Sequence, residues 1–226
     1  MNRLYVLQSL IRHKKLKNYL EIGVLNGHIF FKIQSPFKVA VDPKFKFDRL
    51  RRIGKTILNP YNLTSQYFEV TSDDFFEQHA QQVFANRSID LCLIDGMHEY
   101  GHALRDVENT LRYMSDKGVI VMHDCNPVTP QAARHFREWN GQGFWNGDVW
   151  KAILHLRSSR TDINVFVLDC DYGLGIITKG NCENPQRMAL EDINSLSYQD
   201  LSENREQWLN LKPQEYFYEY FKVPRQ

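Results

Sequence analysis

The stretch Asp90-Leu-Cys-Leu-Ile-Asp-Gly-Met-His-Glu-Tyr100 decides the fold, and Gly118-Val-Ile-Val-Met-His-Asp-Cys-Asn126 repeats its pattern. Each is an apolar run of strand length that ends abruptly in acidic and imidazole side chains. Open α/β sheets place their chemistry at the carboxyl ends of parallel strands. The segment 99–113 between the two runs is long enough for a helical, right-handed crossover. We therefore expect an active site where four ionisable side chains follow the two runs: Asp95, His98, His123 and Asp124.

The alternation of strand-like and helical segments predicts an α/β, Rossmann-like fold with helices on both faces of the sheet. Its sheet should have seven strands, mostly parallel, with a C-terminal antiparallel hairpin. We expect strands at 18–22, 37–41, 66–70, 89–94, 119–122, 164–169 and 173–178. We expect helices at 4–16, 28–33, 49–55, from 72 onward, and at 99–113, 130–139 and 148–156.

Length and the absence of linker-like segments favour a single domain over residues 1–226. Its core should span about 17–180, followed by a helical tail over 181–226. The tail is polar with aromatic side chains at intervals, which predicts that it packs on the domain or forms a partner surface.

Composition excludes several classes of protein. The net charge of +1 gives no bulk electrostatic reason for a nucleic-acid or membrane partner. Four widely spaced cysteines without a CxxC pair argue against a disulfide framework or a zinc site. The apolar segment 4–11 precedes its basic residues, the reverse of a signal peptide, and no run approaches the roughly 20 apolar residues of a membrane span. We expect a soluble, cytoplasmic protein, with homo-oligomer formation left open.

A glycine-containing turn, Glu21-Ile-Gly-Val-Leu-Asn-Gly27, follows the first predicted strand. Glycines in such a turn let the backbone approach a ligand closely. Asp42 ends the second predicted strand, where an acidic side chain can accept hydrogen bonds from ribose hydroxyls. The turn and Asp42 together indicate a nucleoside site, and a simple tight turn is the alternative.

Four motifs now occur in order: Glu-Ile-Gly-Val-x-x-Gly at 21–27, Val-Asp-Pro at 41–43, Ile-Asp-Gly-x-His-x-Tyr at 94–100 and Val-Ile-Val-x-His-Asp-Cys-Asn-Pro at 119–127. Together they resemble the class I S-adenosylmethionine-dependent methyltransferases, and more narrowly methyltransferase family 24. The resemblance covers about residues 19–179. It implies S-adenosylmethionine as the cofactor, and dinucleotide cofactors fit the two acidic strand ends less well.

The resemblance also implies roles for the cofactor-binding residues. The residues that would line the methionine part are Glu21, Gly23 and Gly27. Asp42 would hold the ribose, and Ser72 and Asp73 would lie near the adenine. Asp95 is counted both among the cofactor-binding residues and among the metal ligands. Leu25 stands where the usual turn has a third glycine, so the fit to the cofactor is less certain there.

The sequence is similar to metal-dependent sugar O-methyltransferases, and this similarity assigns the acidic and histidine cluster. It makes Asp95 and Asp124 metal ligands and His98 the general base. His123 occupies a position that is acidic in some relatives, so it is a third candidate ligand and leaves Mg²⁺, Mn²⁺ and Fe²⁺ open. The alternatives are that Asp95 caps the following helix, that His98 is a surface histidine, and that His123 packs beneath the site.

Trp139 and Trp145 flank a glycine-containing loop after the second apolar run. Such a loop can act as a lid, and its aromatic rings can stack on a sugar. Core packing is the alternative, and for Trp150 we expect packing. Asp148 is expected to be a helix N-cap, and Lys151 to be exposed to solvent.

The reaction expected from these features is O-methylation of a hydroxyl on a sugar or similar small polyol. A small-molecule substrate is expected, with no nucleic acid and no membrane. Two other functions remain as alternatives. One is a cofactor-binding protein without transferase activity, and the other is a metal-dependent oxidative enzyme in which His123 helps to hold iron.

Overall fold

The computed structural model describes residues 1–225, which divide into two compact units. The first unit comprises residues 2–96 and 105–119, and the second comprises residue 1, residues 97–104 and residues from 120 onward. One helix, α5 (Tyr100–Tyr113), and one strand, β5 (Met114–Met122), contribute residues to both. The expectation of a single domain stays a prediction.

The first unit alternates strands and helices, as the sequence predicts. Its elements are α1 (Arg3–Lys14), β1 (Asn18–Ile22), η1 (Phe30–Lys32), β2 (Phe37–Val41), α2 (Arg49–Leu58), η2 (Pro60–Thr64), β3 (Ser65–Phe68), α3 (Ser72–Gln78), α4 (Ala80–Val83) and β4 (Ile89–Ile94). The strand order is β3-β2-β1-β4, with β5 next to β4. β1 pairs in parallel with both β2 and β4, and β2 pairs in parallel with β3.

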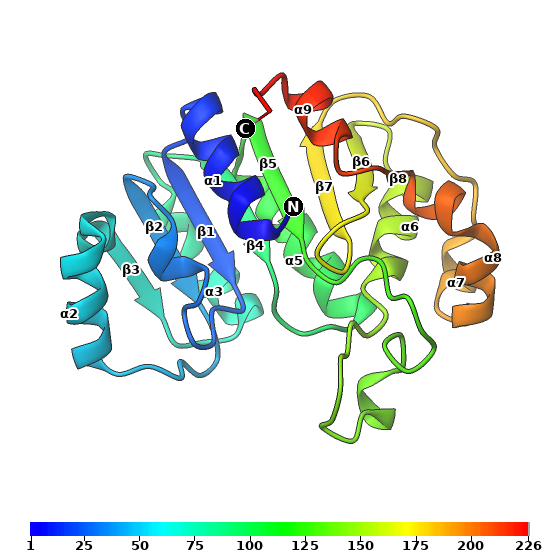
Figure 1. Ribbon diagram of the computed structural model, residues 1–226, viewed down its shortest axis with the longest axis horizontal. Helices are drawn as coiled ribbons and strands as arrows, with labels where there is room; N and C mark the ends of the chain where they lie inside the picture. The colour runs from blue at the N-terminus through cyan, green and yellow to red at the C-terminus, as the bar shows by residue number, and fades with distance from the viewer. Residues whose placement is uncertain (226) are drawn as a thin grey trace. The chain divides into compact units, whose positions relative to one another are not determined.

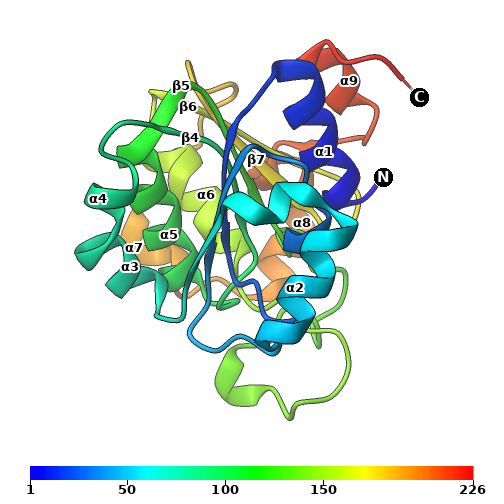
Figure 2. The same cartoon turned by 90° about the vertical axis from the view of Figure 1, so that its left-hand side faces the viewer.

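Burial explains why the apolar runs form the central strands. All six residues of β4 are buried, and four of the five residues in each of β1 and β2 are buried. A strand covered on both faces has a nearly continuous apolar sequence. In Figure 2, α1 and α2 lie on one side of these strands and α3 and α4 on the other. The predicted α/β architecture with helices on both faces is confirmed.

The second unit contains the predicted antiparallel hairpin. Its elements are η3 (Phe136–Glu138), α6 (Trp150–Ser159), β6 (Ile163–Leu168), β7 (Leu174–Lys179), α7 (Leu190–Ile193), α8 (Tyr198–Leu209), β8 (Leu211–Lys212) and α9 (Tyr216–Phe221). Strands β6 and β7 pair antiparallel, and the order continues from β5 as β7-β6-β8 (Figure 1). The prediction of seven strands is therefore wrong by one. The eighth, β8, is a two-residue strand parallel to β6, too short to leave a periodic pattern.

Two predicted helices are not formed. In the segment 28–33 only the 3-10 turn η1 exists. The ammonium group of Lys38 donates to the carbonyls of Phe30 (2.8 Å) and Ile33 (3.1 Å), so these acceptors are satisfied without a longer helix. Pro36, three residues after the segment ends at residue 33, also disfavours continuation.

In the segment 130–139 only η3 is helical. The indole of Trp145 donates to the carbonyl oxygen of Arg134 (2.8 Å), and the Arg134 guanidinium donates to the carbonyl of Gln142 (2.8 Å). Arg134 is thus bonded to groups from later in the loop, and its carbonyl accepts from the Trp145 indole instead of from a helical N–H. Because these partners come from outside the predicted helix, local sequence patterns could not reveal them.

The aromatic side chains of the C-terminal tail pack inside the second unit. Trp150 is 1% exposed and stacks on Trp208, with ring centroids 6.1 Å apart and planes at 9°. Phe217 and Phe221 of α9 are also buried. The prediction that Trp150 packs in the core is confirmed. The expectation that the neighbouring Lys151 is exposed is wrong, because its ammonium group is buried and donates to the Asn194 carbonyl at 2.8 Å.

Candidate active site

The turn after β1 is held against the end of β4 by a glycine. Gly23 has a φ of +87°, and a Cβ there would lie 2.1 Å from the carbonyl oxygen of Asp95. The Asp95 N–H donates to the Ile22 carbonyl at 2.9 Å, which continues the pairing of the two strands. Any larger residue at position 23 would push the two strand ends apart, so the glycine serves close backbone packing at the sequence-predicted cofactor turn.

Asp42, at the end of β2, is buried and organises the same turn. One carboxylate oxygen accepts the Leu25 N–H at 2.7 Å, and the other accepts the Lys44 N–H at 2.8 Å. Leu25 has a φ of +45°, so it takes the left-handed conformation that the third glycine of the usual turn would favour. The leucine side chain thus changes the surface of the turn without changing its backbone type. Each Asp42 oxygen keeps acceptor capacity for a further hydroxyl donor.

Glu21 is buried in β1 beside Tyr19, whose hydroxyl donates to its carboxyl group at 2.5 Å. Burial raises the pKa of Glu21 to about 8, and burial also raises the pKa of Tyr19 well above its ordinary value. On neighbouring β2, burial lowers the pKa of Lys38 to about 7. Glu21 is therefore a protonated, hydrogen-bonded group at neutral pH. Its predicted contact with the methionine part of a cofactor stays a prediction.

Ser72 and Asp73 begin α3, but the N-cap is the preceding residue, Thr71, whose hydroxyl accepts the Asp74 N–H at 3.1 Å. Asp73 forms an exposed ion pair with Arg105 at 3.0 Å. Ser72 hydrogen-bonds the buried carboxyl of Asp106, and burial raises the pKa of that carboxyl to about 7. The predicted contact of Ser72 and Asp73 with adenine stays a prediction.

Asp95, the residue after β4, has a cationic neighbour that the sequence did not suggest. The guanidinium Nε of Arg3, in the first turn of α1, lies 3.4 Å from Asp95 Oδ2. Both side chains are partly exposed, at 25% and 17%. Arg3 is separated from Asp95 by most of the first unit, so only the fold brings them together. A carboxylate beside a guanidinium is favoured in its charged form.

In the second unit, the imidazole of His98 faces the carboxylate of Asp124. His98 Nε2 lies 3.3 Å from Asp124 Oδ2, and His98 Nδ1 lies 2.9 Å from the carbonyl oxygen of Trp145. A carbonyl only accepts hydrogen bonds, so Nδ1 carries a proton. Nε2 is the ring nitrogen that faces Asp124, and this carboxylate can stabilise the cation that forms when Nε2 takes a proton.

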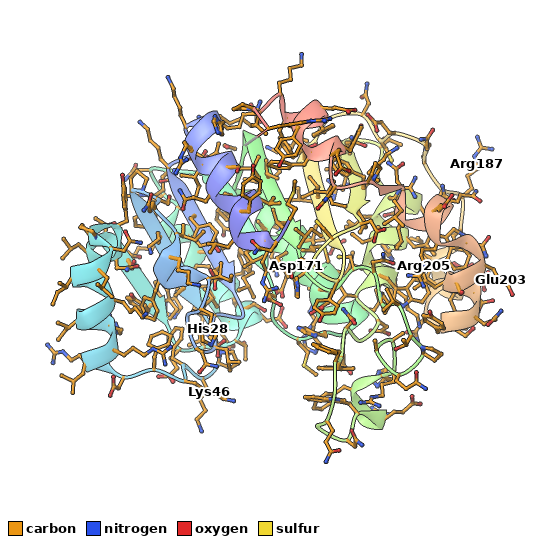
Figure 3. All side chains as sticks on the ribbon, viewed as in Figure 1. His28, Lys46, Asp171, Arg187, Glu203 and Arg205 are labelled. Carbon is orange, nitrogen blue, oxygen red and sulfur yellow. The ribbon has the colours of Figure 1, made fainter. Side chains whose placement is uncertain are left out.

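Asp124 is buried and is contacted by several donors. The amide of Asn146 donates to its Oδ1 at 2.6 Å, and His123 Nδ1 lies 2.9 Å from its Oδ2. Asp124 also has a φ of +63°, which non-glycine residues seldom adopt and which is often associated with functional sites. His123 lies between two carboxylates, because its Nε2 is 3.7 Å from Asp171 Oδ1 (Asp171 is labelled in Figure 3).

The segment 145–148 holds His98 in place. The Trp145 ring stacks on the imidazole, with centroids 5.1 Å apart and planes at 25°. Gly147 has a φ of +64°, and a Cβ there would lie 1.7 Å from the His98 carbonyl oxygen. The prediction that Asp148 caps its own helix α6 is wrong. The Asp148 carboxylate instead accepts the Tyr100 N–H at 2.6 Å, at the start of α5, while its own N–H donates to the His98 carbonyl at 3.3 Å.

A cavity of about 330 Å³ lies within the second unit, between the loop at 128–146 and Tyr172. Two of its lining residues contact the Asp124 cluster. Asn146 donates to Asp124, and the Tyr172 ring is edge-on to His123 with centroids 6.2 Å apart. Phe144 packs against Tyr172 at 5.2 Å. The remaining lining side chains are mostly small or polar: Val128, Thr129, Gln131, Ala132, Arg134, Gln142 and Gly143.

Comparison with known proteins finds a family that matches part of the chain. Residues 20–125 match a sequence family described as a methyltransferase domain, family 24. The solved structure of a putative O-methyltransferase from Klebsiella pneumoniae aligns with a TM-score of 0.56 and 14% identity, covering 78% of this chain and 79% of that chain. The family match and the shared fold support a class I S-adenosylmethionine-dependent methyltransferase. The resemblance drawn from its four motifs is confirmed.

Two further solved structures share the fold of this methyltransferase. The O-methyltransferase TomG from Streptomyces achromogenes, solved with S-adenosylmethionine, has a TM-score of 0.59 and 11% identity, covering 79% and 80% of the two chains. The O-methyltransferase from Bacillus cereus, solved with S-adenosylhomocysteine, has a TM-score of 0.53 and 15% identity, covering 77% and 78%. No curated protein matches the chain. At these identities the structural likeness extends to the fold alone.

Sequence reasoning missed several residues that shape the methyltransferase site. Arg3 contacts Asp95, Asn146 contacts Asp124, and Asp171 lies near His123. Asn146 and Asp171 lie in two further segments that resemble the same family, Trp145-Asn-Gly-Asp-Val-Trp-Lys151 and Asp171-Tyr-Gly-Leu-Gly175, and this resemblance is a signal that could have found them. Arg3 left no such signal, because a single arginine in a helix near the N-terminus is ordinary.

Proposed function

We propose that this methyltransferase transfers the methyl group of S-adenosylmethionine to a hydroxyl of a sugar or similar small polyol. The observation that carries the proposal is the pair His98–Asp124, in which His98 Nε2 lies 3.3 Å from a buried carboxylate. The methyl group leaves the sulfonium and bonds to the hydroxyl oxygen. The hydroxyl proton passes to His98 Nε2, and the products are a methyl ether and S-adenosylhomocysteine.

The cofactor half of the proposal uses the turn after β1. Asp42 would accept the ribose hydroxyls, since both of its oxygens already have one backbone donor and can accept another. The turn from Gly23 to Gly27 would carry the methionine part, where Leu25 keeps the left-handed conformation. The start of α3 would contact the adenine. The solved relatives bound to S-adenosylmethionine and S-adenosylhomocysteine support this cofactor.

The acceptor half of the proposal uses the cavity beside Asp124. Aromatic faces and amide groups together are the side chains that bind sugars, and this cavity offers Phe144 and Tyr172 with Gln131 and Gln142. The lining contains no carboxylate, which leaves an uncharged acceptor favoured over a cation. Asn146 connects this cavity to the carboxylate that faces the proposed base.

A divalent metal is a second, separate proposal. We propose that His98 and Asp124 of the second unit hold it, because an imidazole with a carboxylate suits Mn²⁺ or Fe²⁺ more than Mg²⁺. The predicted ligand role of Asp95 stays a prediction. The metal would lower the pKa of the acceptor hydroxyl and orient it. His123, which contacts Asp124, then orients a ligand and is not a ligand itself. The metal proposal and the base proposal assign His98 differently.

The first experiment is calorimetric titration of the protein with S-adenosylmethionine and S-adenosylhomocysteine, followed by a screen of sugars and polyols for methyl transfer. Asp42→Ala should weaken binding of both cofactors at least about tenfold, because two or more hydrogen bonds are lost. Lys44→Ala keeps the backbone N–H that contacts Asp42 and serves as the control. Absence of binding by either cofactor to the unaltered protein contradicts the proposal.

The second experiment separates the two assignments of His98. His98→Ala should lower the turnover rate at least about 100-fold, the usual contribution of a general base. If His98 is the base, transfer survives exhaustive chelation and the variant loses the rate dependence on imidazole protonation. If His98 is a ligand, chelation abolishes transfer and the variant binds Mn²⁺ more weakly in calorimetry. His102→Ala, an exposed histidine on α5, is the matched control.

A further inference from the structure

The helix α2 of the first unit has its apolar face turned to solvent. It contains no buried residue, and the exposed fractions of its apolar side chains are 77% for Leu50, 52% for Ile53, 77% for Ile57 and 79% for Leu58. Leu50, Ile53 and Ile57 have the spacing that places side chains on one face of a helix. An ordinary amphipathic helix buries this face, so α2 is inverted with respect to the protein.

Polar contacts hold α2 in this orientation. The Arg52 guanidinium lies over the Tyr67 ring of β3, 3.7 Å from its centroid. The Asn62 amide donates to the Lys55 carbonyl at 3.0 Å. At the C-terminal end, the Asn59 amide donates to the carbonyls of Phe31 and Ile33, both at 3.0 Å. These contacts hold the polar face of α2 against the rest of the first unit and leave its apolar face in solvent.

The apolar side chains are surrounded by positive charge. Lys44, Lys46, Arg49 and Arg51 are exposed on α2 or just before it, and Figure 3 shows Lys46 extending away from the ribbon. The nearby carboxylate of Asp48 is engaged as the N-cap of α2, where it accepts the Arg51 N–H at 2.8 Å. The helix itself contains no acidic residue.

This surface continues onto η2 and the end of α1. Leu63 of η2 is 74% exposed, and Tyr61 of η2 lines a hollow together with Lys15 and Lys17. Arg12 lines the same hollow. Charge is also distributed unevenly along the whole sequence. Residues 1–70 contain 13 Lys and Arg against 4 Asp and Glu, a net charge of +9, whereas residues 71–226 contain 15 against 23, a net charge of −8.

We propose that α2 and η2 form a peripheral membrane-binding surface that rests on an anionic phospholipid bilayer. An interfacial helix inserts Leu and Ile side chains at the level of the headgroups, while Lys and Arg around them contact lipid phosphates. The net charge of +1, from which no membrane partner is expected, conceals this local distribution. The proposal does not depend on the identity of the methyl acceptor.

The chemistry of the surface favours lipid over other partners. A nucleic-acid surface is read by basic and polar side chains, whereas here Leu50, Ile57 and Leu58 protrude furthest. A second copy of the chain would bring a second set of cations, including Arg49 and Arg51, into the same interface, and like charges in an interface are unfavourable. An anionic bilayer satisfies both the cations and the protruding apolar groups.

The test is co-sedimentation of the full chain with vesicles of phosphatidylcholine, with and without phosphatidylglycerol. We expect binding only to the anionic vesicles, with a loss of binding as salt screens the cations. The double variant Arg49→Glu/Arg51→Glu should lower the partition coefficient at least about tenfold, because each basic residue near an anionic surface contributes about fivefold. Leu50→Asp/Ile57→Asp should lower it by a similar factor.

The matched control is Arg187→Glu/Arg225→Glu, which makes the same change in net charge at exposed positions of the second unit (Arg187 is labelled in Figure 3). It should bind anionic vesicles as the unaltered protein does. Thermal melts of all variants verify that each is folded. Equal binding to neutral vesicles, absence of binding to anionic ones, or an equal loss in the control overturns the proposal. A stable dimer that Leu50→Asp dissociates also overturns it and assigns the face to a second copy.

Discussion

Glu21 and Asp124 are buried to a similar degree, at 2% and 5% exposure, yet their neighbours differ. Glu21 receives one hydrogen bond, from the Tyr19 hydroxyl, and burial raises its pKa to about 8. Asp124 is contacted by the imidazoles of His98 and His123 and by the amide of Asn146. The chemistry open to a buried carboxyl group therefore depends on the donors around it more than on its exposure.

The difference suggests separate tasks for the two groups. At neutral pH Glu21 keeps its proton, so it acts as a hydrogen-bonding, uncharged part of the β1 packing. Asp124 has three polar contacts that can hold or orient a proton carrier or a cation. We therefore expect changes at Asp124 to affect methyl transfer, and changes at Glu21 to affect the dependence of stability on pH.

The largest effect is expected for Asp124→Asn, which keeps the size of the side chain and tolerates the positive φ. Its turnover rate should fall at least about 100-fold, because the amide cannot stabilise a cationic His98 or bind a metal as a carboxylate does. S-adenosylhomocysteine formation with an acceptor from the screen measures the rate. Near-normal turnover would show that the contacts around Asp124 are structural. Asp124 would then, like Glu21, have no direct part in methyl transfer.

A smaller effect, now on stability, is expected for Gly23→Ala in the turn that follows Glu21. The new Cβ would lie 2.1 Å from the Asp95 carbonyl oxygen at a φ of +87°, so the free energy of unfolding should fall by about 3 kcal/mol. Gly54→Ala in α2, where a Cβ meets nothing within 4 Å, is the control and should stabilise by about 0.5 kcal/mol. Urea denaturation measures both, and equal effects would contradict close packing at Gly23.

Glu21→Gln tests the carboxyl group itself through pH. Because folding raises the pKa of Glu21 from 4.5 to about 8, the folded state binds the proton more tightly, and stability falls as pH rises across that interval. The variant lacks this loss. Its stability relative to the unaltered protein should therefore increase by about 2 kcal/mol between about pH 5 and pH 6.5. Thermal melts without cofactor measure it, and a pH-independent difference would refute the protonated assignment.

The smallest effect is expected at a third buried carboxyl group, Asp148. Asp148→Ala removes the acceptor for the Tyr100 N–H and should lower the free energy of unfolding by about 1 kcal/mol, the usual contribution of a helix cap. Asp148→Asn should restore most of it, since an amide oxygen also accepts. If both variants are equally unstable, the carboxylate acts through its ion pair with Lys151, 3.7 Å away, and not as a cap.

Elements whose formation depends on local pattern were predictable from sequence. β1, β2 and β4 lie where apolar runs of strand length predict them, because each is buried. Asp95 and Asp124 each follow an apolar run, and both lie within residues 20–125, which match the methyltransferase family. Topology contributed as much as composition, since only parallel strands bring such ends to one edge of a sheet.

Features determined by distant partners were not predictable. Lys38 takes the carbonyls that a helix over 28–33 would have used, although nothing in that segment indicates it. Asp148 has the sequence pattern of a cap for α6 but caps α5, whose first N–H lies 48 residues earlier in the chain. The inverted α2 is the clearest case, because its periodicity predicts a helix and would normally predict a buried apolar face.

The contacts between His98 and residues 145–148 also bear on how this enzyme can vary. Trp145, Gly147 and Asp148 each touch His98 or the start of α5, so an insertion among them would displace the imidazole. Earlier in the loop, Trp139 supports this segment by stacking on Trp145 at 4.7 Å, whereas Gln142, Gly143 and Phe144 line the cavity. Changes of side chain at 142–144 can alter the cavity while His98 stays in place. The loop thus separates the part of the enzyme that can diversify its substrates from the part that must be kept.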